Sequence, residues 1–135
     1  MVQSEDGLRK ILTTSKTIAV VGLSNNPERP SYDVASYLKD HGYRIIPVNP
    51  TIKEALGEKA YPSLKEIPER VDVVQIFRRP EEVPAIVEDA IAIGAKVVWM
   101  QPGAENEDAA AKAESAGLKA VVGACMRTVH RSLRL

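Results

Sequence analysis

The sequence contains few of the residues that form disulfide frameworks and metal centres. Its 135 residues include one cysteine and two histidines. One cysteine excludes an internal disulfide and suits the reducing cytoplasm, and so few ligands argue against a catalytic metal site. No apolar run approaches the ~18 residues that a membrane-spanning helix needs, and Met1–Asp6 lacks the charged-then-apolar pattern of a signal peptide. We therefore expect a cytoplasmic protein that does not enter membranes.

An excess of charge of either sign is also absent. Eighteen Lys and Arg residues balance eighteen Asp and Glu residues, which argues against a protein held to nucleic acid by bulk charge. The basic segment 127–134 has no aromatic residue interleaved with its arginines, so we expect no nucleic-acid partner. With 44% hydrophobic residues and a length typical of one domain, the chain is predicted to fold as a single domain over residues 1–135.

Five short runs rich in valine and isoleucine are typical of buried parallel strands. Several are apolar at consecutive positions, which is the pattern of strands covered on both faces. Their spacing leaves room for a crossover helix between neighbours. The predicted strands are residues 18–21, 44–48, 71–77, 96–100 and 118–122.

The segments between the strands have the i, i+3, i+4 periodicity of amphipathic helices. A further helix containing Leu8, Ile11 and Leu12 is expected to pack outside the sheet, and Ser63 with Glu66 can form a capping box on a short helix. The main helices are predicted over residues 31–41, 81–93 and 105–116, with Gly42, Gly94 and Gly117 as their caps.

Alternating strands and helices indicate a single Rossmann-like α/β domain, in which a doubly wound parallel five-stranded sheet forms the middle of three layers. Numbered along the chain, the strands are expected in the order 3-2-1-4-5. In that order the chain reverses direction between the first and fourth strands, so a ligand-binding crevice is predicted at their carboxyl ends.

Residues 22–31 leave the first strand and enter a helix. They lack the Gly-x-Gly-x-x-Gly of dinucleotide-binding folds and the Gly-Lys-Ser/Thr of a P-loop. They combine one glycine, Gly22, with small polar residues, Arg29, and a helix start at Pro30 and Ser31, where free N–H groups and the positive end of the dipole favour an anion. We interpret the segment as a phosphate site or, alternatively, as a solvated turn whose side chains cap backbone groups.

The ends of the next three strands carry basic and small residues. Asn49 and Pro50 stand where an NAD site has an acidic residue, and the following Lys53 suits a phosphate better than a bare ribose. The two arginines of residues 77–80 can bind phosphate in a bidentate manner, or can pair with the carboxylates that follow. Gly103 lets the backbone approach a ligand closely.

In the order and spacing of four segments, the chain resembles the small stand-alone CoA-binding proteins, whose fold is that of the N-terminal CoA-binding domain of the succinyl-CoA synthetase α subunit. The resemblance extends over residues 15–127. The matching segments are residues 18–24, 43–50, 71–74 with 77–80, and 98–103.

The resemblance implies particular contacts with coenzyme A. It places residues 24–27 in the loop that wraps the phosphates, Pro50 and Lys53 at the Pro and phosphate-binding Lys after the second strand, and the main chain of Met100 and Gln101 beside the pantetheine. The candidate CoA-binding residues are Gly22, Leu23, Ser24, Asn25, Asn26, Pro27, Arg29, Pro30, Ser31, Asn49, Pro50, Lys53, Phe77, Arg78, Arg79, Met100, Gln101 and Gly103.

The leading hypothesis is a module that binds CoA or an acyl-CoA in the crevice without catalysis of its own, because no convincing acid–base pair is present. Synthetases of the resembling family need a phosphorylated histidine and a nucleotide-binding subunit, which come from segments outside this sequence. Two alternatives stay open. One is an NAD(P)-binding oxidoreductase or redox-sensing module, and the other is one subunit of a split acyl-CoA synthetase whose partner supplies the ATP chemistry.

Overall fold

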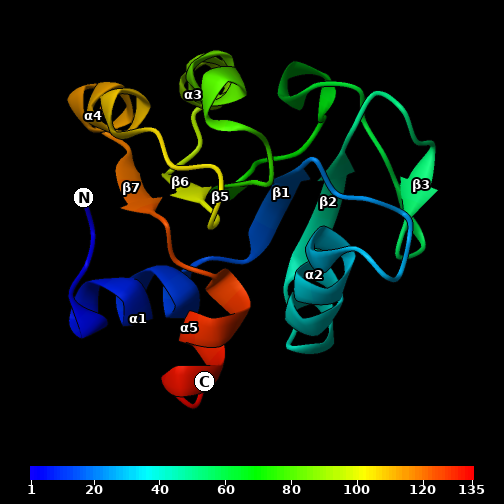
Figure 1. Ribbon diagram of the computed structural model, residues 1–135, viewed down its shortest axis with the longest axis horizontal. Coiled ribbons are helices and arrows are strands. Elements are labelled where there is room, and N and C mark those ends of the chain that lie inside the picture. The colour runs from blue at the N-terminus through cyan, green and yellow to red at the C-terminus, as the bar shows by residue number, and fades with distance from the viewer.

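The structure, a computed structural model that describes all residues from Met1 to Leu135, is built on one parallel sheet (Figure 1). Every residue of the inner strands β5 and β6 is buried, as expected for strands covered on both faces. All four strand pairings are parallel, so the predicted five-stranded parallel sheet is confirmed. The strands are β1 (Thr17–Val21), β2 (Arg44–Val48), β5 (Val73–Ile76), β6 (Val97–Met100) and β7 (Lys119–Val122).

The predicted order of the strands was wrong. The observed order is β2-β1-β5-β6-β7, so the third of the five strands along the chain lies beside the first and not outside the second. β5 pairs with β1, with Ile18 opposite Val73, while the outer edge of β2 is occupied by Tyr61, whose N–H donates to the Pro47 carbonyl (3.0 Å). Because β5 is wholly buried, it belongs in the middle of the sheet. The chain therefore reverses between β1 and β5, and the crevice moves with that switch point.

Five α-helices cover the two faces of the sheet (Figure 1). Successive residues of each strand face opposite layers, so the sheet divides the core into two hydrophobic clusters. This three-layer arrangement is the predicted one, and the N-terminal helix packs outside the sheet as expected. One face carries α1 (Glu5–Thr14), α2 (Pro30–Asp40) and α5 (Met126–Ser132), and the other carries α3 (Val83–Ala92) and α4 (Glu107–Ser115).

The three glycines predicted to end helices do so. Gly42, Gly94 and Gly117 have φ angles of +95°, +74° and +91°, the left-handed conformation that glycine adopts without steric cost. Each is followed closely by a strand, which keeps these connections short. None of the five helices combines the length and the apolar character needed to cross a membrane.

Two short 3₁₀ turns differ in detail from the predicted helices. The helix expected over residues 81–93 begins with the turn η2 (Pro80–Glu82), and α3 follows it. The short helix expected near residue 64 is the single turn η1 (Leu64–Glu66). Its capping box is not formed, because the Ser63 hydroxyl accepts from no backbone N–H and instead donates to the Glu66 carboxylate (3.4 Å).

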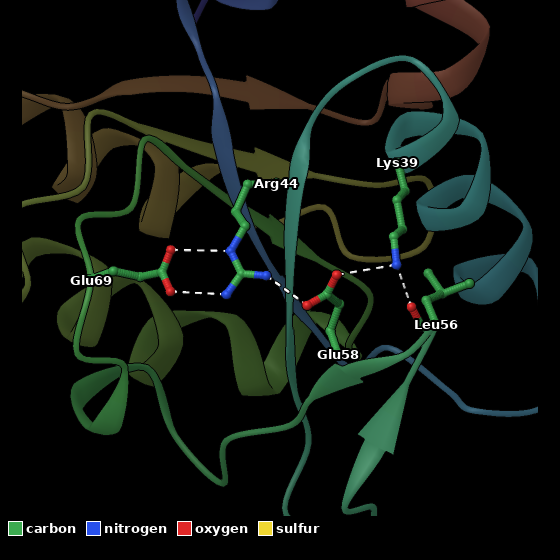
Figure 2. Close-up of polar contacts among 5 residues, drawn as sticks. All are labelled: Lys39, Arg44, Leu56, Glu58 and Glu69. Carbon is green, nitrogen blue, oxygen red and sulfur yellow. Dashed lines mark hydrogen bonds and ion pairs between the residues drawn. The ribbon is translucent and has the colours of Figure 1, made fainter.

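The connection from β2 to β5 contains a small antiparallel hairpin, β3 (Glu54–Ala55) and β4 (Glu58–Lys59), that the sequence analysis did not predict. Figure 2 shows the polar network that holds it. Arg44 donates to Glu58 (2.6 Å) and to Glu69 (3.0 and 3.2 Å), while Lys39 of α2 pairs with Glu58 (3.1 Å) and donates to the carbonyl of Leu56 in the turn. The network ties the hairpin to α2, to β2 and to the segment before β5.

Candidate functional site

A polar cleft of about 590 Å³ opens at the carboxyl ends of β1, β5 and β6, at the observed switch point. All but three of its lining residues, namely Glu82, Pro102 and Ala104, are among the sequence-predicted ones. Its size is within the range of ligand-binding pockets, ~300–1,000 Å³. The polar cleft is lined by Gly22, Ser24, Arg29, Pro30, Ser31, Asn49, Phe77, Arg78, Arg79, Glu82, Pro102, Gly103 and Ala104.

Gly22 lets the two strands at the switch point come together at the floor of this cleft. Its φ angle is +91°, and a Cβ atom built on it would lie 2.3 Å from the carbonyl oxygen of Phe77. A side chain there would therefore push apart the ends of β1 and β5. The single glycine of this loop is therefore required at its position for a steric reason.

The loop from β1 to α2 is ordered by its own side chains. The Ser31 hydroxyl accepts from the N–H of Ser24 (3.0 Å), the Ser24 hydroxyl accepts from Asn26 N–H (3.0 Å), and the Asn26 side chain accepts from Glu28 N–H (3.0 Å). These are the backbone-capping contacts of the alternative interpretation. No side chain caps the first turn of α2 itself, so its N-terminal N–H groups stay available beside Ser24 and Ser31 in the cleft.

Three arginines give the polar cleft an excess of positive charge. Arg29 is exposed and forms no ion pair, and Arg79 pairs with the only lining carboxylate, that of Glu82 (3.8 Å). The same carboxylate accepts from the N–H of Arg79 (3.3 Å). Because Glu82 is held in this way, it neutralises one guanidinium and leaves two to attract an anion.

A second cleft of about 350 Å³ adjoins the first, and Arg78 and Glu82 line both. Its walls are mainly apolar and come from the ends of β1 and β2, the segment before and within η1, and one side of α3. We call it the apolar cleft. It is lined by Val21, Val48, Pro50, Pro62, Ser63, Leu64, Arg78, Glu82, Ala85, Ile86 and Asp89.

The sequence analysis missed most of the apolar cleft. Only Pro50 and Arg78 of its lining were predicted, because most of the other lining residues come from η1, η2, α3 and the residues before η1, and not from the segments that directly follow strands of the sheet. The periodicity of α3 put Ile86 on its apolar stripe, but only the structure shows that Ile86 is partly buried and lines the apolar cleft.

Seven predicted residues lie outside both clefts. The side chains of Leu23 and Met100 are fully buried in the core, and Gln101 is 3% exposed. The side-chain Oε1 atom of Gln101 accepts from the side-chain amide of Gln75 (3.1 Å) and from the N–H of Met126 (2.8 Å), so this side chain links β5 and β6 to α5. The remaining four, all exposed, are Asn25, Asn26, Pro27 and Lys53.

Cys125 occupies a polar environment at the N-terminus of α5 and is half-buried. Burial raises the pKa of its thiol, but hydrogen bonds from Thr128, Gln101 and the backbone of Arg127 outweigh that effect and hold the pKa below its ordinary value. It lines neither of the two clefts. Trp99 is fully buried, and its indole N–H donates to the Ala124 carbonyl (2.8 Å).

Comparison with known proteins gives relatives of two kinds. The sequence model of a family described as CoA binding domain matches residues 16–131. The chain is 45% identical over 127 residues to the uncharacterized protein YneT of Bacillus subtilis strain 168, and the match covers 94% of each. A hypothetical protein from Pyrococcus horikoshii OT3 has a solved structure with a TM-score of 0.95 and 44% identity, covering 98% of this chain and 94% of that one.

The second kind of relative is much longer than this chain. The chain is 37% identical over 95 residues to the acetate–CoA ligase (ADP-forming) I subunit alpha of Pyrococcus furiosus. That match covers 64% of this chain and only 20% of the ligase subunit. The same kind of domain is therefore found both in proteins of this length and as a part of a ligase subunit.

Proposed function

The chain belongs to the family of CoA binding domains, and we propose that it binds coenzyme A across the polar and apolar clefts. The observation that carries the proposal is that an arginine-lined cleft adjoins an apolar one at the switch point of the sheet. CoA has chemically matching parts. Its phosphates are anionic and suit the arginine-lined cleft, and its adenine ring is flat and largely apolar on both faces and suits the apolar cleft.

In the proposed arrangement the diphosphate lies in the polar cleft. Arg29 and the N-terminus of α2 supply positive charge, and Ser24 and Ser31 line the same wall. The adenine ring lies in the apolar cleft between Pro50, Pro62 and Ile86. The pantetheine arm then leaves along the strand ends, past Phe77 toward Gly103.

The lining supports binding more than chemistry. Glu82 is the only carboxylate of the polar cleft and is engaged by Arg79, and neither histidine lines either cleft. A general acid or base must reach the proton that it transfers. We therefore propose a CoA-binding module without catalysis of its own.

NAD(P) fits the same fold less well. A typical NAD site uses a glycine-rich first loop and an acidic residue after the second strand to hold the ribose hydroxyls. Here the loop has Gly22 alone, and Asn49 follows the strand with its side chain committed to the Leu23 carbonyl (3.1 Å) and to Thr51.

A second function is favoured by the similarity to the Pyrococcus furiosus ligase subunit. In that case the chain presents CoA to a separate protein that activates the acyl group. Incubating the purified protein with ATP, acetate and CoA tests whether it needs such a protein. We expect no CoA-dependent release of ADP by the chain alone, and turnover by the chain alone would contradict a pure binding function.

Isothermal titration with CoA tests the main proposal, with NADH titrated at the same salt concentration. We expect saturable one-to-one binding of CoA and no heat from NADH. Arg29→Ala is expected to weaken CoA binding about 10- to 100-fold, the worth of one charge-assisted contact of ~1.5–3 kcal/mol. Arg131→Ala, an exposed arginine on α5 outside both clefts, is the matched control. Binding of NADH without binding of CoA would overturn the proposal.

A further inference from the structure

Arg78 is a partly buried cation without a partner. Three arginines of the chain, Arg9, Arg78 and Arg127, are partly buried, and the others are exposed. Arg9 bonds to Glu5 and the Leu133 carbonyl, and Arg127 pairs with Asp33. Arg78 forms no hydrogen bond or ion pair through its side chain, and none of its nitrogen atoms is fully buried. Its N–H donors are therefore available to an anion that enters the clefts.

The position of Arg78 explains which acceptor it can meet. It follows the end of β5, and its Cδ atom lies 3.4 Å from the point where a Cβ on Gly22 would stand, so its side chain extends over the loop that leaves β1. It lines the polar and the apolar cleft at once. The guanidinium therefore belongs to the junction of the two clefts.

The nearby carboxylate does not satisfy this guanidinium. Glu82 also lines both clefts, but its Oε2 atom accepts from the N–H of Arg79 and lies 3.8 Å from the guanidinium of Arg79. The neighbouring arginine thus uses the acid, and Arg78 is left to an external anion. Its planar group can hold two phosphate oxygens at once, which a lysine cannot do.

We propose that Arg78 binds the 3′-phosphate of CoA and makes the site selective for a nucleotide that carries a phosphate on its ribose. The inference rests on the proposed function. With the adenine in the apolar cleft and the diphosphate in the polar cleft, the ribose lies at their junction, and its phosphate faces Arg78, the one arginine that lines both clefts. Lys53, which the sequence indicated for a phosphate, is exposed and lines neither cleft.

The test compares CoA with dephospho-CoA, which lacks only the 3′-phosphate, in isothermal titrations of the intact protein and of Arg78→Gln. Adenosine 3′,5′-bisphosphate is a third probe that carries the same ribose phosphate without the pantetheine arm. We expect the intact protein to prefer CoA over dephospho-CoA by about tenfold or more, as for a bidentate charge-assisted contact. Arg78→Gln is expected to bring that ratio close to one and to weaken the bisphosphate by a similar factor.

Lys53→Gln and Arg131→Gln, which change exposed cations outside both clefts, are the matched controls and are expected to keep the ratio. Arg78→Lys retains charge without the planar fork and is expected to give an intermediate ratio, which serves if Arg78→Gln unfolds at the assay temperature. The inference is overturned if both Arg78 variants keep the preference for CoA over dephospho-CoA, or if Lys53→Gln loses it. Either result leaves the proposed binding of CoA intact. If the intact protein does not bind CoA, the proposed function fails and this inference fails with it.

Discussion

Gly22 is the residue at which the ends of β1 and β5 meet, and its two constraints can be separated by mutation. Alanine at this position would have both a φ of +91° and a Cβ 2.3 Å from the Phe77 carbonyl oxygen. Gly94 has a similar φ of +74° but open space around its Cβ position. Gly94→Ala is therefore expected to cost only the backbone strain, about 1 kcal/mol. Gly22→Ala must also displace a backbone carbonyl, and we expect it to lower the free energy of unfolding by at least twice as much.

Urea denaturation of the two variants measures this difference directly. CoA titration adds a second readout. Gly22→Ala is expected to weaken CoA binding because it displaces Phe77, which lines the polar cleft, whereas Gly94 lines neither cleft. Equal losses of stability for the two variants would show that the close approach of the strand ends contributes nothing.

His130 links α5 to α2 through a cluster of aromatic rings. The side chain is 3% exposed, its Nδ1 atom lies 2.9 Å from the Tyr37 hydroxyl, and its ring contacts those of His41 and Tyr43. Burial and the neighbouring His41 hold the pKa of His130 below its ordinary 6.5. The unfolded chain therefore binds more protons than the folded one between the lowered pKa and about 6.5. The contribution of the neutral ring to stability is complete above that window and is lost as the pH falls through it.

His130→Asn can keep a hydrogen bond to Tyr37 but cannot titrate. We expect its free energy of unfolding to change less between pH 5 and pH 7.5 than that of the intact protein, which should become more stable as the pH rises. Denaturation curves at several pH values measure the two slopes. His41→Asn, which alters the exposed neighbour, should retain most of the slope. An identical pH dependence in His130→Asn would refute this origin.

Residue identities predicted the polar cleft well, because its walls are the segments that directly follow strands. They could not predict the direction of each side chain. Gln101 follows β6 as expected, yet it points into the core because Gln75 and the N–H of Met126 provide partners there. Similarly, which arginine of the Arg78–Arg79 pair stays free depends on the turn η2, which brings Glu82 to Arg79. Such choices arise from tertiary contacts and not from local pattern.

At the level of secondary-structure elements, the sequence predicted every strand of the sheet and every main helix, but not the strand order. The apolar pattern of β5 predicts that this strand is buried. It does not predict on which side of β1 the strand lies. The deciding feature is the connection after β2, where the hairpin β3–β4 and Tyr61 occupy the outer edge of the sheet. Two strands of two residues each are too short to produce a periodic signal.

The network in Figure 2 is expected to stabilise this hairpin by a modest, salt-dependent amount. Glu58 meets both Lys39 and Arg44, and partly exposed pairs contribute about 0.2–1 kcal/mol each. We expect Glu58→Gln to lower the free energy of unfolding at low ionic strength, with a smaller effect in high salt because ions screen the pairs. Glu54→Gln, on the adjoining strand β3 and without an ion pair, is the matched control.

The pH dependence of the same network has a definite sign. The hydrogen bond from Lys39 lowers the pKa of Glu58 below its ordinary 4.5, partial burial opposes this, and Arg44 lowers it further. A depressed carboxyl pKa stabilises the fold above about pH 4.5 and loses that contribution as the pH falls through the lowered pKa. The gap in stability between the intact protein and Glu58→Gln should therefore close on acidification. A gap that persists at low pH, or in high salt, would mean that the ion pairs are not its cause.

At the scale of the whole molecule, CoA is expected to act as a stabilising link between α2 on one face of the sheet and α3 with η1 on the other. The two clefts are formed by the ends of β1, β2, β5 and β6 together with α2, α3 and η1, which lie on both faces of the sheet. The unfolded chain cannot assemble such a surface. A ligand that binds only the folded state therefore raises the free energy of unfolding by RT ln(1 + [L]/Kd), about 2.7 kcal/mol at a hundredfold excess over Kd.

Thermal unfolding measures this effect through the midpoint temperature Tm. We expect CoA to raise Tm by several degrees at that excess, since one kcal/mol corresponds to roughly 2–8 °C for domains between 60 and 250 residues. The shift should shrink as salt is added, because the phosphates are held by charge in a cleft open to solvent, and it should be smaller for Arg29→Ala at the same CoA concentration. NADH at equal concentration should leave Tm nearly unchanged. If NADH raised Tm as much as CoA, the clefts would recognise only the ADP portion that the two ligands share, and selectivity for CoA would have to be abandoned.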